Sequence, residues 1–138
     1  MSIHLEDASG ADIGSCAGTL VAEKLVLTAG HCVVNASTWR VEGAGKTVTA
    51  SRAVTPWKKF DSTLSHPKHA DIALLVLDDA IKIARYPSIA TDGLKDGAKA
   101  TRMHRSASGS KDFVSTDAVI RDGAAKGFNL AYTAEMPK

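Results

Sequence analysis

The chain has 138 residues, of which 44% are hydrophobic and 23% charged, as expected for a globular protein that builds its own hydrophobic core. Its formal net charge is only +2 and its Lys and Arg residues are scattered, so we expect no nucleic-acid partner. The longest apolar run, residues 72–77, is far shorter than the roughly 20 residues that cross a bilayer, and we expect neither a membrane partner nor an encoded signal peptide.

Short strands of alternating polar and apolar residues, separated by turn residues, dominate the first half of the chain. The pattern predicts six strands, at residues 2–5, 15–21, 24–28, 38–42, 46–50 and 71–77. A turn is expected at residues 7–10, a short helical turn at 29–34 and a polar loop at 58–69. Residues 43–45, Gly-Ala-Gly, predict the tip of a hairpin whose second arm is prolonged by residues 51–54.

The pattern changes after the pair Asp78 and Asp79. Residues 85–89 are predicted to form a connector, and further turns and strands follow. The turns are expected at residues 92–93 and 96–97, and the strands at 99–104, 114–121 and 128–133. Short strands at this spacing favour an all-β fold, an antiparallel barrel or sandwich. We therefore expect two domains, residues 1–88 and 89–138.

The only two cysteines are Cys16 and Cys32. A bridge between them would close a loop of about 17 residues, which adds roughly 3 kcal/mol to stability by the loop-entropy model. Such a bridge would indicate an oxidising compartment, whereas two reduced, buried cysteines would suit a cytosolic protein. The spacing alone leaves both interpretations open.

Two titratable residues stand where a strand meets a turn. His31 follows the apolar residues 25–27, and a neutral imidazole can take a proton from a hydroxyl and return it to a leaving group. Asp71 precedes five apolar residues, where a carboxylate is costly unless it has a partner such as a histidine. Taken singly, each residue is more simply explained as structural, His31 at a strand end and Asp71 facing solvent.

Together the segments around these two residues are more specific. Residues 16–21 (CAGTLV) and 25–32 (LVLTAGHC) resemble the region of the catalytic histidine in chymotrypsin-like (trypsin-like) serine proteases, C-G-G-[ST]-L-[IV] followed by W-V-L-T-A-[AG]-H-C. Residues 66–75 (HPKHADIALL) resemble the same family's H-P-x-[YF]-x-x-D-I-A-L-L segment, here one residue shorter. The resemblance is dense over residues 13–34 and 64–77 and weak elsewhere.

This resemblance implies an all-β fold in which residues 1–88 form an antiparallel, six-stranded-type β-barrel, the N-terminal half of the two-barrel chymotrypsin-like fold. Residues 89–138 would be the linker and first strands of an incomplete second barrel. It also implies that His31 is general base and then acid, that Asp71 orients it, and that Cys16 and Cys32 form a disulfide. No metal or other cofactor is implied, and the compartment would be extracellular or periplasmic.

The sequence departs from the family at the nucleophile. The family's serine lies in G-D-S-G-G, a motif absent from these 138 residues. The later serines are more simply explained as loop or strand-face residues; they are Ser106, Ser108, Ser110 and Ser115. We therefore expect a serine endopeptidase chain that lacks its nucleophile segment and is inactive alone. Its partners would be a protein or peptide substrate and the remainder of its own protease domain; the alternative is a non-catalytic, protease-like binding module.

Two further short motifs are weaker indications of function. His66, His69 and Asp71 have the spacing H-x-x-H-x-D, which could provide part of a zinc site. The family resemblance accounts for the same residues without a metal. Asn35, followed by Ala36 and Ser37, forms an N-glycosylation triplet, which has a meaning only in a secreted eukaryotic protein.

Overall fold

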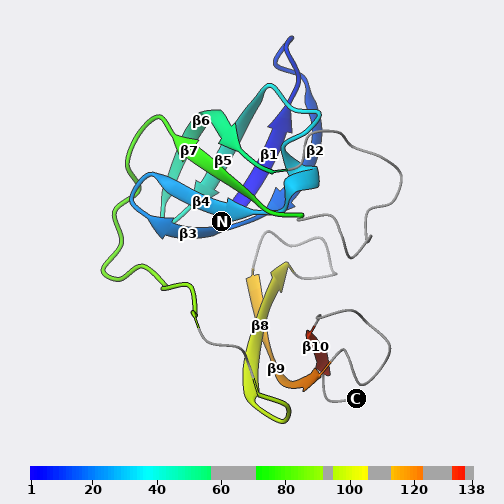
Figure 1. Cartoon of the computed structure of the whole chain (residues 1–138). Helices are drawn as coiled ribbons and strands as arrows, with labels where there is room; N and C mark the ends of the chain where they lie inside the picture. The colour runs from blue at the N-terminus through cyan, green and yellow to red at the C-terminus, as the bar shows by residue number, and fades with distance from the viewer. Residues whose placement is uncertain (57–70, 92–94, 106–112, 123–131, 136–138) are drawn as a thin grey trace. The chain divides into compact units, whose positions relative to one another are not determined.

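The structure is a computed structural model that describes residues 1–56, 71–91, 95–105, 113–122 and 132–135. The chain divides into two compact units, Met1–Ile89 and Ala90–Lys138. In the described ranges the regular secondary structure is ten strands and one short 3-10 helix (Figure 1), which confirms the predicted all-β class. None of those ranges holds a helix with the length and apolar character needed to span a membrane.

The first unit contains a curled, seven-stranded sheet in which every neighbouring pair is antiparallel (Figure 1). The strands are β1 (Ser2–Glu6), β2 (Asp12–Ala17), β3 (Thr19–Ala22), β4 (Leu25–Thr28), β5 (Thr38–Gly43), β6 (Lys46–Val54) and β7 (Ala73–Leu77). Their order in the sheet is β2-β1-β5-β6-β7-β4-β3. The two end strands, β2 and β3, are therefore consecutive in the chain.

The seventh strand arises because the strand predicted at residues 15–21 is divided at Gly18. Before Gly18 the chain pairs with β1, and after it the chain pairs with β4. A Cβ atom on Gly18 would lie 2.6 Å from Val26 Cγ1 and 2.8 Å from Ile3 Cδ1. The residue at this position must have no side chain, because the backbone passes directly over the core as it changes partner.

The hairpin between β5 and β6 has the tight tip that its glycines predict. Gly43 pairs with Lys46, so the turn consists of Ala44 and Gly45. Both have positive φ angles, 50° and 72°, as a type I′ turn requires. Such a turn follows the twist of the two strands, so it sets the register of β5 against β6.

The core of the first unit lies inside the curled sheet. Along β7 buried and half-buried residues alternate, as the period of two predicts. The largest fully buried side chains are Ile3, Val26, Val41, Leu75, Leu77 and Ile81. Burial of each such side chain contributes about 1.5–3 kcal/mol, which makes this sheet a rigid support for the residues at its ends.

The second unit contains a three-stranded antiparallel sheet of β8 (Lys99–Arg105), β9 (Phe113–Asp122) and β10 (Tyr132–Glu135) in the order β10-β9-β8. Strands were expected at residues 99–104 and 114–121, and both are confirmed. The third was expected at 128–133, of which 128–131 lie outside the described residues, and the described strand ends later than predicted. The predicted loop at 58–69 and turn at 92–93 also lie outside the described residues.

Candidate functional site

His31 lies in a single helical turn that directly follows β4. The 3-10 helix Gly30–Cys32 is closed by two main-chain hydrogen bonds, from Cys32 N–H to Ala29 O at 3.2 Å and from Val33 N–H to Gly30 O at 3.0 Å. Gly30 and Cys32 are buried, whereas His31 between them is exposed. The two buried neighbours hold the turn in place while the imidazole faces solvent. The observed helical turn is shorter than the predicted range of 29–34.

Asp71 lies two residues before β7, which begins at Ala73 rather than at Asp71 as predicted. Strands β4 and β7 are antiparallel, and Thr28 at the end of β4 pairs with Ala73 at the start of β7. This register brings the residues that follow β4 beside those that precede β7. Two segments forty residues apart in the sequence thus meet at one end of the sheet.

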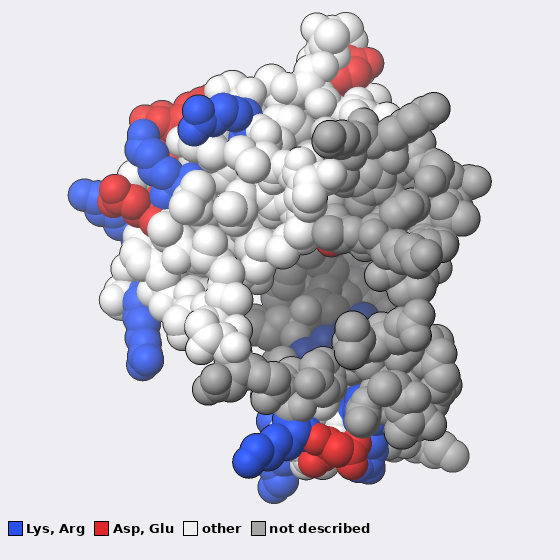
Figure 2. All heavy atoms as spheres, viewed as in Figure 1, with Lys and Arg blue, Asp and Glu red and all other residues white. Residues whose placement is uncertain are grey.

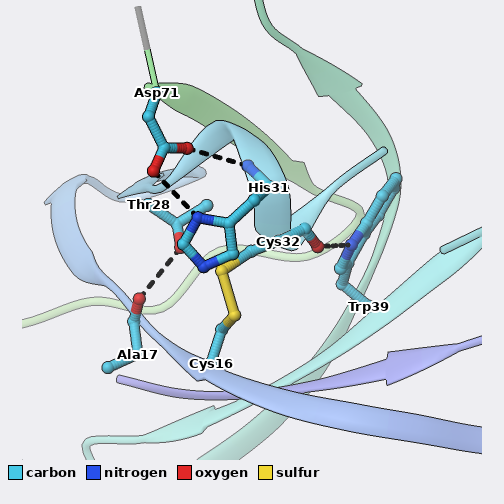
Figure 3. The surroundings of a disulfide bond; sticks show 7 residues. All are labelled: Cys16, Ala17, Thr28, His31, Cys32, Trp39 and Asp71. Carbon is cyan, nitrogen blue, oxygen red and sulfur yellow. Dashed lines mark hydrogen bonds and ion pairs between the residues drawn. A yellow bond between two sulfur atoms is a disulfide. The ribbon is translucent and has the colours of Figure 1, made fainter. Parts of the chain in front are cut away.

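The carboxylate of Asp71 binds His31 at two atoms (Figure 3). Its Oδ1 accepts the main-chain N–H of His31 at 2.9 Å, and its Oδ2 lies 2.8 Å from Nδ1 of the ring. The side chains are 41% exposed for His31 and 30% exposed for Asp71. The pair is therefore open to a reactant yet fixed in its mutual geometry.

The contact determines which ring nitrogen of His31 carries the proton when the imidazole is neutral. A carboxylate can only accept a hydrogen bond, so Nδ1 must donate and Nε2 keeps its lone pair. Among the residues that the structure describes, none hydrogen-bonds to Nε2. A neutral imidazole in this state can accept a proton at Nε2 from a hydroxyl group placed there.

Asp71 is held in its charged form. Partial burial acts to raise the pKa of Asp71, but the main-chain N–H of His31, the hydrogen bond and charge of its ring, and the N–H of Gly30 together lower that pKa below its ordinary value. The carboxylate is therefore ionised at neutral pH and available to orient the ring and to stabilise an imidazolium.

Three further contacts fix the turn that carries His31 (Figure 3). Cys16 and Cys32 form a disulfide, with sulfur atoms 1.99 Å apart, that ties the turn to β2. The buried hydroxyl of Thr28 donates to Ala17 O at 2.9 Å. The indole N–H of Trp39 donates to Cys32 O at 3.0 Å. Sequence reasoning found the cysteines but missed Thr28 and Trp39, since neither contact follows from spacing along the chain.

Metal binding has little support here. The two sulfur atoms and a ring nitrogen of His31 lie within 4.8 Å of one another. However, Cys16 and Cys32 are joined as a disulfide and cannot offer the thiolates that zinc prefers. Of the predicted set His66, His69 and Asp71, the two histidines lie outside the described residues, and Asp71 is bound to His31.

The other predicted residues add little to this site. Of the serines considered as nucleophile, only Ser115 lies in the described residues; it is an exposed residue of β9 that pairs with Met103. Asn35 of the glycosylation triplet is exposed. On the face drawn in Figure 2, Lys and Arg side chains lie among Asp and Glu side chains, and uncharged residues cover most of the described surface.

Comparisons with known proteins identify a family model and a fold that the chain matches. A family model described as Trypsin matches residues 3–119, and no curated protein matches the sequence. A solved structure of kallikrein-related peptidase 10 in complex with Zn²⁺ is 19% identical with a TM-score of 0.68, and the match covers 99% of this chain and 68% of that one. A collagenase structure is 16% identical with a TM-score of 0.66, covering 90% and 58%.

A third solved structure, a scabies mite inactivated protease paralogue, is 17% identical with a TM-score of 0.66, covering 97% of this chain and 70% of that one. Identities this low show the fold alone. The expected fold, part of a chymotrypsin-like structure, is thereby confirmed. The chain spans between 58% and 70% of the lengths of these structures.

Proposed function

The chain belongs to the trypsin family, and from that premise we propose that it is the part of a serine-type endopeptidase that carries the histidine and aspartate of the triad. The main support is the double contact of Asp71 with the main chain and ring of His31. A binding surface has no physical need for this arrangement, whereas an acyl-transfer enzyme needs an imidazole with one nitrogen free and the other held.

In the proposed reaction, His31 Nε2 takes the proton of a serine hydroxyl as its oxygen attacks the carbonyl carbon of a peptide bond. The imidazolium so formed then gives that proton to the leaving amine, which leaves an acyl-enzyme. Water then attacks the acyl-enzyme: His31 Nε2 takes a proton from the water and gives it to the serine oxygen as the acid product leaves. Asp71 stays ionised throughout, holds Nδ1–H and stabilises the imidazolium.

We propose that the serine is supplied from outside these 138 residues. They contain no Gly-Asp-Ser-Gly-Gly motif, and the chain spans only part of the length of the similar structures. By this proposal the 138-residue chain alone is inactive, because it lacks both the nucleophile and the main-chain donors for the oxyanion. Its substrates would be proteins or peptides, and its disulfide suits an extracellular or periplasmic location.

A second candidate is a non-catalytic binding module with the protease scaffold. One observation favours it: a protein with this fold is described as an inactivated protease paralogue. The chain lacks the serine motif but keeps the ordered His31–Asp71 pair, and this retained pair makes the endopeptidase the better proposal.

The test begins with the coding sequence downstream of Lys138. An in-frame Gly-Asp-Ser-Gly-Gly motif is expected, and the longer product should hydrolyse a peptide library and react with a fluorophosphonate. His31→Ala should abolish both activities, whereas Ser115→Ala, on the exposed face of β9, should leave both unchanged. The 138-residue chain should not react. Stoichiometric labelling of that chain, or an active His31→Ala product, would contradict the proposal, and a stop codon directly after Lys138 would favour the binding module.

A further inference from the structure

Trp39 connects the hydrophobic core of the first unit to the turn that carries His31. It lies in β5 between Leu5 of β1 and Ala50 of β6, and only 4% of its surface is exposed. Its indole N–H leaves this apolar cluster to donate to the carbonyl oxygen of Cys32, 3.0 Å away, in a buried hydrogen bond (Figure 3). A buried tryptophan generally needs such a partner for its N–H, but here the partner is the residue next to His31.

The turn needs this support because it is very short. The 3-10 helix has three residues and two main-chain hydrogen bonds, and such a turn is weak when it stands alone. The Cys32 carbonyl belongs to the peptide that leaves the turn. The disulfide restrains only the side chain of Cys32. The peptide that follows Cys32 is held at two atoms: its Val33 N–H donates to Gly30 O inside the turn, and its carbonyl oxygen accepts the indole N–H of Trp39 from outside the turn. The indole is therefore the contact that ties this peptide to the core.

His31 is thus held on both sides. Asp71 holds its main-chain N–H on one side, and Trp39 holds the carbonyl of the next residue on the other. We propose that Trp39 is a positioning residue for His31: its indole N–H keeps the turn in the one arrangement in which the ring reaches Asp71. This rests on the proposed function, in which the geometry of His31 and Asp71 matters for proton transfer.

Phenylalanine at position 39 would keep an aromatic ring in the core, although a smaller one, and could not donate a hydrogen bond. The indole N–H can also be removed with almost no change of shape, by incorporating β-(3-benzothienyl)alanine in place of Trp39. The matched control is Val41→Ala, because Val41 is a fully buried residue of the same strand. The control lowers stability through a core cavity and leaves the bond to Cys32 intact.

The measurement is ¹⁵N and ¹H NMR of the His31 ring in the folded 138-residue chain, at a pH where the imidazole is neutral. The exchange of the Nδ1 proton with water reports how often the ring leaves Asp71. Loss of one buried hydrogen bond should raise this exchange by about tenfold in both the benzothienyl chain and Trp39→Phe. The control Val41→Ala should exchange at the parent rate, although it unfolds at a lower urea concentration.

The outcomes separate this inference from the proposed function. A parent chain with the proton on Nε2 instead of Nδ1 would overturn the proposed function and, with it, the role of Trp39. The role of Trp39 alone would be overturned if the Nδ1 proton is protected from exchange in the parent chain and is protected to the same extent in the benzothienyl chain. An equally large rise in the Nδ1 exchange rate of Val41→Ala would also overturn the role of Trp39, because a general loosening of the core would then explain the faster exchange.

Discussion

Asp71 binds His31 through both of its carboxylate oxygens, one on the main-chain N–H and the other on the ring. The two contacts restrain different degrees of freedom. The bond to the main-chain N–H fixes the position of the turn, and the bond to the ring fixes the rotation of the imidazole. Asp71 itself is placed by the pairing of Thr28 with Ala73. The orientation of the imidazole therefore follows from the register of two strands at one end of the curled sheet.

The double contact predicts that Asp71→Asn changes the tautomer of His31. An asparagine amide can donate to Nδ1, which would leave the proton on Nε2 and remove the lone pair that accepts a proton. At a pH where the imidazole is neutral, the ¹⁵N shifts of the ring should show Nδ1–H in the parent chain and Nε2–H in the variant. Asp78→Asn is the control, because Asp78 lies at the other end of β7 and accepts a hydrogen bond from Ser51. A variant that keeps Nδ1–H would contradict the prediction.

The lowered pKa of Asp71 predicts how this contact stabilises the fold at different pH values. A carboxylate whose folded-state pKa is depressed contributes stability above its unfolded value, about 3.9, and loses it as the pH falls through the folded value. The free energy of unfolding of the parent minus that of Asp71→Asn should therefore be positive above about pH 4 and shrink as the pH falls below that value. Urea titrations of both chains across this range measure the difference. A difference that grew as the pH fell below about 4 would show that the pKa of Asp71 is raised and not lowered.

Parts of this site could be predicted from the sequence, and parts could not. His31, Asp71 and the two cysteines lie in short motifs of contiguous residues that resemble one protein family, and this resemblance predicted the disulfide and the pairing of His31 with Asp71, which the spacing alone had left open. The bond from Trp39 to Cys32 depends on where β5 lies in the sheet, and no local pattern specifies that. The division of the strand at Gly18 was missed for the same kind of reason, since alternation of apolar residues continues across the point where the pairing partner changes.

The disulfide should contribute about 3 kcal/mol, because it closes a loop with a sequence separation of 16 residues. The paired variant Cys16→Ser with Cys32→Ala should lower the free energy of unfolding by roughly this amount in urea titration. Dithiothreitol should destabilise the parent chain to a similar extent and leave the paired variant unchanged. Equal midpoints for the oxidised and reduced parent chain would mean that the bond adds nothing to stability.

The tip of the β5–β6 hairpin is a place where the chain can be made more stable. Ala44 has a φ angle of 50°, in the left-handed region that costs an ordinary residue roughly 1–2 kcal/mol. Asparagine tolerates this region and is favoured in type I′ turns, so Ala44→Asn should raise the free energy of unfolding by about 0.5–1 kcal/mol. Ala44→Val should lower it, because β-branched residues are strained there. Thermal unfolding followed by circular dichroism compares the three chains.

Gly18 is the opposite case, a position where one added methyl group should be destabilising. Its Cβ would meet Val26 Cγ1 at 2.6 Å, Ile3 Cδ1 at 2.8 Å and the main-chain oxygen of Leu27 at 3.0 Å. The side chains could move aside but the carbonyl is held in β4, so Gly18→Ala should cost about 1–3 kcal/mol. Ile3→Val removes the Cδ1 atom, and in the Ile3→Val background the same change at Gly18 should cost measurably less. Additive effects in this double-mutant cycle would show that the two residues do not meet at the point where β2 gives way to β3.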